Sequence, residues 1–253
     1  MPLEFLPASL EGRTLLQISD IHVGPKVSSS YLIETFARAR DLEPDFVAFT
    51  GDFVSYRSAN EYRELARVLK YAPNGKLGTV GALGNHDYGF GWKHIDVADQ
   101  VAGVATDAGI RVLRNEVQTI GGVQFAGLND LWSPQFEPTV TLASLMPKEA
   151  TIVLSHNPDV QDLPVWDGVR AWVLAGHTHG GQVKPPFLPP PLLPVKNKRY
   201  AAGTYAIAPG RTLYINRGLG HLIQVRFNVR PELTLFTLRR PTPEVVATTN
   251  LLG

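Results

Sequence analysis

The sequence predicts an α/β fold made of two packed sheets with helices outside them, and two observations lead to this prediction. Short apolar runs alternate with helical patterns in the first half of the chain, and strand-like segments dominate the second half. The 253 residues can bury one large core, and neither a flexible linker nor a repeat of solenoid length divides them. We therefore expect one domain over residues 1–253.

The first half of the chain follows a β-α-β-α-β order. Strands are predicted over residues 14–19, 45–51 and 79–85, and helices over 28–42 and 58–72. The first helix places Leu32, Phe36 and Ala39 on one face, which is the spacing of an amphipathic helix. Because a helix separates consecutive strands, we expect parallel strand pairs.

The second half is dominated by sheet. Further strands are predicted over residues 117–128, 151–156, 171–176, 205–216 and 231–238. The first of these ranges contains a turn at Gly121 and Gly122, and the fourth contains one at Pro209 and Gly210, so each of the two predicts a hairpin.

Charge and composition exclude several classes of function. The formal net charge is +1, so the chain lacks the electrostatic footprint of a nucleic-acid binder and no nucleic-acid partner is expected. It has no cysteine, so a metal would be bound through nitrogen and oxygen. It has no apolar window of about twenty residues, and its first residues lack a basic stretch followed by an apolar run. We expect a cytoplasmic protein, and we expect any association with a membrane to be peripheral.

Residues of metal-binding type follow five of the predicted strands. They are Asp20 and His22, Asp52, Asn85, His156, and His177 with His179. Ligands of open α/β sheets gather outside the carboxyl ends of the strands, so these five strand ends can meet in one place. Seven donors are too many for one tetrahedral zinc, but they suit two ions that share a bridging carboxylate. Imidazole combined with carboxylate favours manganese, iron or zinc over calcium.

The same blocks of sequence resemble the calcineurin-like metallophosphoesterases. That family has the motifs Asp-x-His, Gly-Asp, Gly-Asn-His-Asp/Glu, His and Gly-His-x-His, and this chain matches each of them. The resemblance implies a four-layer α/β/β/α sandwich with two divalent metal ions, for which we expect manganese, with iron or zinc as alternatives. It assigns Asp20, His22, Asp52 and His179 to the first ion, and Asp52, Asn85, His156 and His177 to the second.

The resemblance also implies a mechanism. His86 would contact the phosphate and help the leaving group to depart, and Asp87 would orient His86. A metal-bound hydroxide would attack phosphorus in line, while both ions and His86 stabilise charge on the phosphoryl oxygens. Such a reaction needs no phosphoenzyme.

Longer stretches narrow the resemblance to one bacterial branch. ISDIHVG, GHTHGGQV with the prolines that follow it, INRGLG and RFNVRPELTLFTL resemble the YkuE/YaeI-type phosphodiesterases. Relatives of that branch include enzymes that act on lipid-linked sugar nucleotides. We therefore expect hydrolysis of a phosphodiester or pyrophosphate bond in a small-molecule or lipid-linked phosphoester. Two alternatives stay open: a broad-specificity phosphomonoesterase, and a scaffold that binds metal or phosphate without catalysis.

Other features have two interpretations each. The proline-rich loop 185–195 is either a rigid packed loop, which we favour, or an apolar lip that meets a lipid tail or a membrane. For Arg217 we favour a salt bridge over a contact with substrate phosphate. For Asn129 and Asp130 we favour a role in a turn over one in the cleft. Trp132 is assigned to the core rather than to a substrate platform.

Overall fold

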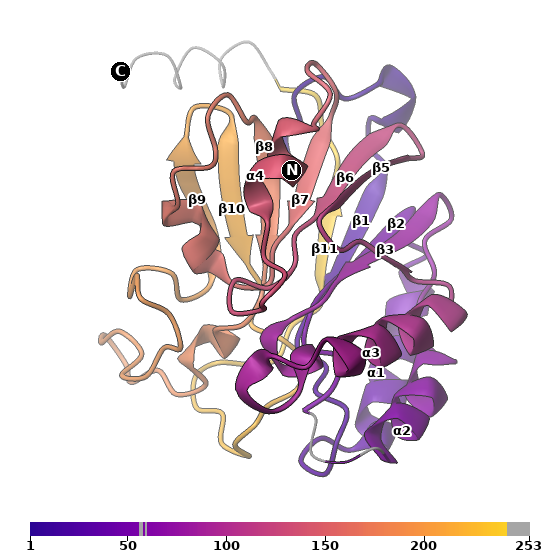
Figure 1. The fold of residues 1–253 in the computed structure, drawn as a ribbon, viewed down its shortest axis with the longest axis vertical. Coiled ribbons are helices and arrows are strands. Elements are labelled where there is room, and N and C mark those ends of the chain that lie inside the picture. Colours follow the sequence, from indigo (N-terminus) through magenta and orange to yellow (C-terminus); the bar gives the residue numbers. More distant parts are fainter. Residues whose placement is uncertain (56–57, 59, 242–253) are drawn as a thin grey trace.

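Two sheets packed face to face form the centre of the molecule (Figure 1). The computed structural model describes residues 1–55, 58 and 60–241. Helices α1 (Ser29–Asp41), α2 (Asn60–Leu69) and α3 (Ile95–Asp107) cover the outer face of one sheet. Helix α4 (Pro138–Ala143) and a short 3₁₀ helix over 158–162 cover the other. The predicted four-layer α/β/β/α sandwich is therefore confirmed.

The first sheet has the strand order β11-β1-β2-β3-β4. Its strands are β1 (Thr14–Ile18), β2 (Phe46–Thr50), β3 (Gly78–Ala82), β4 (Arg111–Val112) and β11 (Thr234–Thr237). Strands β1 to β4 are parallel, because a helix connects each of them to the next along the outer face. Strand β11 pairs antiparallel with β1 and closes the far edge. The parallel strands therefore share one carboxyl edge.

The second sheet has the strand order β5-β6-β7-β8-β10-β9. Its strands are β5 (Glu116–Ile120), β6 (Val123–Gly127), β7 (Thr151–Leu154), β8 (Ala171–Ala175), β9 (Gly203–Ala208) and β10 (Arg211–Ile215). The four inner strands are parallel, whereas β5 and β9 run antiparallel at the two edges as hairpin partners of β6 and β10. Strands β6 and β7 are buried throughout, as expected for strands covered on both faces.

Three apolar clusters hold the layers together. Leu15 and Phe46 of the first sheet meet Phe125 and Ile152 of the second in the central cluster, and all four are fully buried. The other two clusters pack the helices onto the outer faces. Each fully buried side chain of this size contributes about 1.5–3 kcal/mol. This packing fixes the two sheets relative to each other, and with them the strand ends.

All strands and helices predicted from the sequence are present, and both hairpins turn at the predicted glycines. Helices α3 and α4 and the short strand β4 were not predicted. Five of the 13 residues of helix α3 are β-branched, and β-branched residues weaken the helical signal. Its position depends on the packing of Val97, Val101 and Ala105 in the core, which is a tertiary effect. In the described part of the chain, no helix is both long and apolar enough to span a bilayer.

Candidate metal centre

The ends of five parallel strands meet at one edge of the sandwich. Backbone hydrogen bonds connect the segments that follow them: Asp20 N donates to Gly51 O (2.9 Å), and Gly176 N donates to His156 O (3.0 Å). One link crosses between the sheets, because His177 N donates to both carboxylate oxygens of Asp20, at 3.1 and 3.2 Å. The strand ends are therefore joined into one buried layer that carries the polar side chains.

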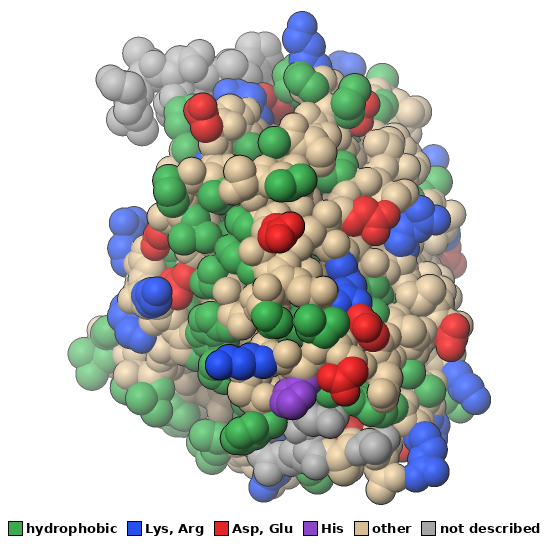
Figure 2. Space-filling model, in the orientation of Figure 1, with side chains coloured by type: hydrophobic (Ala, Val, Ile, Leu, Met, Phe, Trp, Pro, Cys, Tyr) green, Lys and Arg blue, Asp and Glu red, His purple; other side chains and the backbone are tan. Residues whose placement is uncertain are grey.

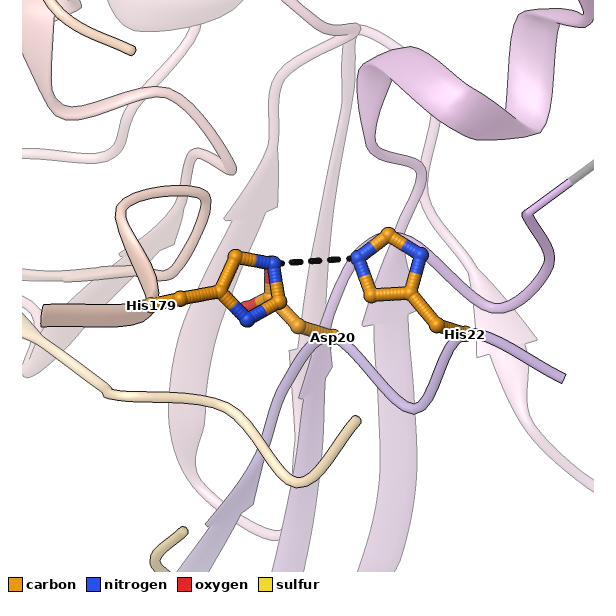
Figure 3. Close-up of side chains that lie close together, drawn as sticks. All are labelled: Asp20, His22 and His179. Atoms are coloured by element: carbon orange, nitrogen blue, oxygen red, sulfur yellow. Dashed lines mark hydrogen bonds and ion pairs between the residues drawn. The ribbon is translucent and has the colours of Figure 1, made fainter. Parts of the chain in front are cut away.

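The first group of potential ligands consists of Asp20, His22 and His179. Figure 3 shows the two imidazole rings with their nitrogens facing each other and Asp20 beside the His179 ring. The two Nε2 atoms lie 3.1 Å apart, and Asp20 Oδ1 lies 3.4 Å from His179 Nε2 and 4.0 Å from His22 Nε2. Two donors about 2.1 Å from one ion and at right angles to each other would lie about 3.0 Å apart. The spacing therefore fits a shared ion.

The second group consists of Asp52, His156 and His177. His156 Nδ1 donates to Thr50 O at 2.7 Å, and His177 Nε2 donates to Pro194 O at 2.9 Å. Because a carbonyl oxygen only accepts, these bonds fix the protonated nitrogen of each ring. His156 Nε2 and His177 Nδ1 are the nitrogens left for a metal, and without a metal His156 Nε2 holds a proton 3.2 Å from Asp52 Oδ2. Such hydrogen bonds orient histidine ligands in metal sites.

Asp52 lies between the two groups. Its Oδ2 atom is 3.4 Å from His22 Nε2 and 3.2 Å from His156 Nε2, so one carboxylate oxygen borders both. Its Oδ1 atom accepts a hydrogen bond from the backbone N–H of His86 at 2.9 Å. Asn85 immediately precedes that N–H and is 1% exposed. All seven residues predicted as ligands therefore lie in this layer, within two adjoining groups or next to Asp52.

Unsatisfied buried atoms provide an independent test of whether these residues suit metal ions. Asn85 Oδ1 is one of the buried side-chain atoms in the described residues that have no hydrogen-bond partner. Leaving a buried acceptor unpaired costs about 1–3 kcal/mol. The amide oxygen of Asn85 is an acceptor with an available lone pair, as metal coordination requires. The donor set thus fits a divalent ion at the second group, and its chemistry of imidazole with carboxylate and amide oxygen suits manganese, iron or zinc.

Burial sets the protonation of the first group. It lowers the pKa of His22 to about 3, so this ring is neutral at pH 7 and can bind a cation. Burial also lowers the pKa of His179 well below its usual value, with the nearby His22 adding to the effect. Burial has the opposite effect on the carboxyl of Asp20 and raises its pKa to about 7. A proton therefore competes with a metal for Asp20 near neutral pH.

In the second group, neighbouring charges as well as burial set the protonation. Burial lowers the pKa of His177 to about 3. Burial would also lower the pKa of His156, but the Asp52 carboxylate outweighs it and raises that pKa well above its usual value. For Asp52 itself burial opposes ionisation, yet His156 and His86 together hold its pKa well below the usual value. Asp52 is therefore ionised at neutral pH, as a bridging ligand must be.

The backbone at the ligands is unusual. Five of the seven have a positive φ: Asp20 (51°), His22 (46°), Asp52 (54°), His177 (71°) and His179 (50°). A residue with a β-carbon loses about 1–2 kcal/mol in this left-handed region. Such strain persists only where the surroundings impose it, and it is concentrated at functional sites. Here the strained residues follow β1, β2 and β8 and turn their side chains into the layer between the strand ends.

His86 and Asp87 follow β3 in a short 3₁₀ helix, Asn85–Tyr88. The His86 ring is half-buried and meets the His22 ring edge to face, with 5.1 Å between the centroids. Asp87 is fully buried, and its carboxylate accepts backbone N–H groups of Phe53 (2.8 Å), Val54 (3.1 Å) and Gly84 (2.8 Å). Asp87 therefore joins the ends of β2 and β3. Its carboxylate fixes the backbone on both sides of His86, and the expected role in orienting His86 stays a prediction.

The structure adds residues to the site that the sequence did not identify. Trp132 meets His177 edge to face at 4.7 Å and stacks on Trp92 at 4.5 Å, so its assignment to the core was wrong. Arg226 Nη2 lies 3.3 Å from His179 Nδ1 and donates to the carbonyl oxygen of Gly220 at 2.6 Å. Both lie far along the chain from the histidines that they contact, so no sequence spacing could have connected them.

Contacts in the structure bear on three residues for which the sequence left two interpretations. Arg217 forms an ion pair with Glu232, as expected. Asp130 Oδ1 accepts the backbone N–H of Trp132 at 2.8 Å, which is the expected turn, but this carboxyl is also 1% exposed and burial raises its pKa to about 6. Asn129 Nδ2 donates to the carbonyl oxygen of Gln135 at 3.0 Å, within the same loop.

The proline-rich loop 185–195 is packed in part, and its contact with a lipid or a membrane stays a prediction. Leu193 and Val195 are 8% and 4% exposed and pack against the body, as a rigid loop would. Phe187, Leu188 and Leu192 remain exposed. The loop therefore packs against the body through Leu193 and Val195, near its C-terminal end.

Comparisons with known proteins agree with this geometry. The family model for calcineurin-like phosphoesterases matches residues 13–181. The chain is 32% identical to phosphodiesterase YaeI of Escherichia coli K12, covering 88% of this chain and 81% of YaeI. It is 31% identical to the uncharacterized metallophosphoesterase YkuE of Bacillus subtilis 168, covering 92% and 82%. It is 27% identical to UDP-2,3-diacylglucosamine pyrophosphatase LpxG of Chlamydia muridarum, covering 90% and 84%.

The fold is also found among solved structures. NAD nucleotidase NadN of Haemophilus influenzae matches 88% of this chain and 49% of its own, with a TM-score of 0.53 and 14% identity. At that identity the likeness supports the fold alone. The family model and the relatives confirm the resemblance that the motifs indicated. The chain belongs to the calcineurin-like phosphoesterase family and is a phosphoric ester hydrolase.

Proposed function

We propose that the chain hydrolyses a phosphodiester or pyrophosphate bond at a dinuclear metal centre. The observation that carries this proposal is the position of Asp52 Oδ2, 3.4 Å from His22 Nε2 and 3.2 Å from His156 Nε2. A carboxylate placed there borders both groups of ligands. When bound, two divalent ions would supply an activated water and neutralise charge on phosphoryl oxygens. Manganese is the expected metal, with iron or zinc as alternatives.

The ligands divide into two sets around Asp52. Asp20, His22 and His179 would hold one ion, and Asn85, His156 and His177 the other, with Asp52 shared. The backbone bonds to Thr50 and Pro194 keep two of these rings in the tautomer that binds metal. Burial keeps His22 and His177 neutral and ready to bind a metal, whereas His156 would release a proton when the metal binds.

His86 is the residue that would act on the leaving group. It follows the ligand Asn85, yet its ring is more exposed than those of the other four histidines in the layer. An imidazole at the open side of the site can donate a proton or a hydrogen bond to the departing oxygen. Asp87 would serve as a positioning residue, because it fixes the backbone on both sides of His86 through three amides.

The relatives support a substrate class. One of them is named as a phosphodiesterase and another as a pyrophosphatase of UDP-2,3-diacylglucosamine, a lipid-linked sugar nucleotide. We propose a small-molecule or lipid-linked phosphoester as the substrate, with peripheral membrane contact through loop 185–195. The cytoplasmic location expected from the sequence stays a prediction. A phosphomonoesterase would use the same ligands, so the substrate assay has to separate the two activities.

Parallel assays test this proposal. Manganese-loaded protein should hydrolyse bis-p-nitrophenyl phosphate and a lipid-linked sugar nucleotide faster than p-nitrophenyl phosphate. The His86→Ala variant should keep its metals but lose about 10²–10⁴-fold in kcat, which is the usual contribution of a general acid. His94→Ala is the matched control, because His94 is an exposed histidine outside the layer. Preference for the monoester would favour the phosphomonoesterase, and the absence of turnover on all three would favour a binding scaffold.

A further inference from the structure

A second loop, which the sequence did not single out, lies against the proline-rich loop. Phe227 N donates to Gln182 O at 2.9 Å, and Lys184 N donates to Phe227 O at 3.0 Å, which forms a bridge between Val183 and Phe227. The Gln182 side-chain amide also donates to the carbonyl oxygens of Ile223 (3.3 Å) and Val225 (3.4 Å). The segments 183–195 and 221–229 therefore form one unit.

This unit presents an apolar surface to solvent. The exposed fractions are 105% for Phe187, 59% for Leu188 and 77% for Leu192 in the first loop, and 63% for Ile223, 52% for Val225 and 55% for Phe227 in the second. Figure 2 shows hydrophobic side chains gathered at the lower left, where Figure 1 places the loop that follows β8. Six large apolar side chains on two joined loops exceed the scattered exposure that needs no explanation. We call these six side chains the docking surface.

The charge around the docking surface is of one sign. Residues 168–231 contain nine lysines and arginines and no aspartate or glutamate. The whole chain has 24 basic and 23 acidic residues, so the rest of it carries 15 basic and 23 acidic residues, a net of −8 against +9. Lys184 lies between the two loops in the bridge, and Lys196 and Arg199 are exposed just after the first loop. Arg170 and Arg217 are paired with Glu4 and Glu232, and Arg211 begins β10, so these three are set aside. The cations exposed on the two loops or next to them in the chain include Lys184, Lys196, Arg199 and Arg230.

Both loops contact histidines of the metal centre. Pro194 O accepts the hydrogen bond that fixes the tautomer of His177, and Arg226 Nη2 reaches His179 Nδ1. Pro194 of the first loop thus contacts a ligand of the second group, and Arg226 of the second loop contacts a ligand of the first group. A surface that holds the two loops would therefore bring a phosphoester within reach of both groups of ligands.

We infer that the docking surface binds the face of an anionic lipid bilayer. Its apolar side chains would enter the interfacial region, and the lysines and arginines would attract acidic head groups, each worth about 1 kcal/mol. A second copy of the chain fits less well, because a symmetric contact would set the same exposed lysines and arginines of two chains against each other. The inference extends the proposed membrane contact to a second loop, and it concerns binding rather than hydrolysis.

Vesicle flotation tests the inference with the full-length chain. The protein should float with vesicles of phosphatidylglycerol and phosphatidylethanolamine, and much less with vesicles of phosphatidylcholine alone. The double variants Phe187→Ser/Leu192→Ser and Ile223→Ser/Val225→Ser should each lower the partition coefficient by at least about tenfold. Lys184→Gln should lower it by roughly fivefold. The matched control is Val140→Ser/Met146→Ser, which removes two exposed apolar residues in and after α4 and should leave partitioning unchanged.

Three results would overturn the inference. They are equal binding to both kinds of vesicle, unchanged binding in both loop variants, or a dimer in light scattering that the same variants dissolve. Turnover of bis-p-nitrophenyl phosphate by the same preparations separates this question from the proposed function. We expect the loop variants to keep that activity, because none of their residues belongs to the two groups of ligands.

Discussion

Replacing Gly51 by alanine should destabilise the protein and disturb the second group of ligands. Gly51 follows β2 immediately before Asp52 and has φ +88°. A β-carbon at this position would lie 2.6 Å from Gly84 N, 2.7 Å from His156 Nδ1 and 2.8 Å from Gly84 Cα. None of these atoms belongs to the far end of a long flexible side chain. The ends of β2, β3 and β7 therefore pack so closely that a single methyl group has no room.

The expected loss of stability follows from two costs. The left-handed conformation costs alanine about 1–2 kcal/mol, and overpacking a tight core costs about 1–3 kcal/mol. Together they predict that Gly51→Ala lowers the free energy of unfolding by about 2–5 kcal/mol. Because one of the colliding atoms donates the hydrogen bond that orients His156, metal affinity should fall as well.

Urea denaturation of the metal-free protein measures the first effect. Gly103→Ala is the matched control, because Gly103 lies inside α3 and a β-carbon there would meet no atom within 4 Å. We expect this control to gain about 0.5–1 kcal/mol, since alanine restricts the unfolded chain more than glycine does. A loss of less than about 1 kcal/mol in Gly51→Ala would show that the strand ends can relax, and it would refute the close packing on which the metal geometry depends.

Two further predictions concern metal binding. Burial raises the pKa of Asp20 to about 7, so a proton must leave this carboxyl when metal binds at lower pH. Metal affinity should fall as pH drops below 7, and calorimetry in buffers of different protonation enthalpy should record proton release; affinity independent of pH would contradict this. Trp132→Leu should weaken metal binding about tenfold by removing the ring beside His177, as is usual for partners of a ligand. Trp172→Leu, which packs on Phe236 instead, should not.

Much of the site could be predicted from the sequence for a simple physical reason. Buried parallel strands produce apolar runs, and the residues that follow such runs emerge at one edge of a sheet. In the structure, Asp20, Asp52 and His156 each lie two positions after the last residue of their strand, which is β1, β2 and β7 respectively. Their convergence therefore needed only the strand assignments.

The remaining features depend on contacts that no local pattern records. The positive φ at His177 and His179 is imposed by packing, since histidine has no preference of its own strong enough to predict it. Trp132 is as apolar as a core residue, and only the fold brings its edge to His177. The three backbone partners of the Asp87 carboxylate likewise depend on the proximity of β2 and β3, which no local pattern records.

The number of ions bound per chain tests the central claim most directly. The claim is that Asp52 lets two groups of ligands act as one dinuclear centre. Elemental analysis of protein loaded with manganese and freed of excess metal should give two ions per chain, and Asp52→Asn should bind fewer, because the carboxylate that lies next to a histidine of each group loses its charge. One ion per chain in the unaltered protein, or two in Asp52→Asn with unchanged affinity, would contradict the account.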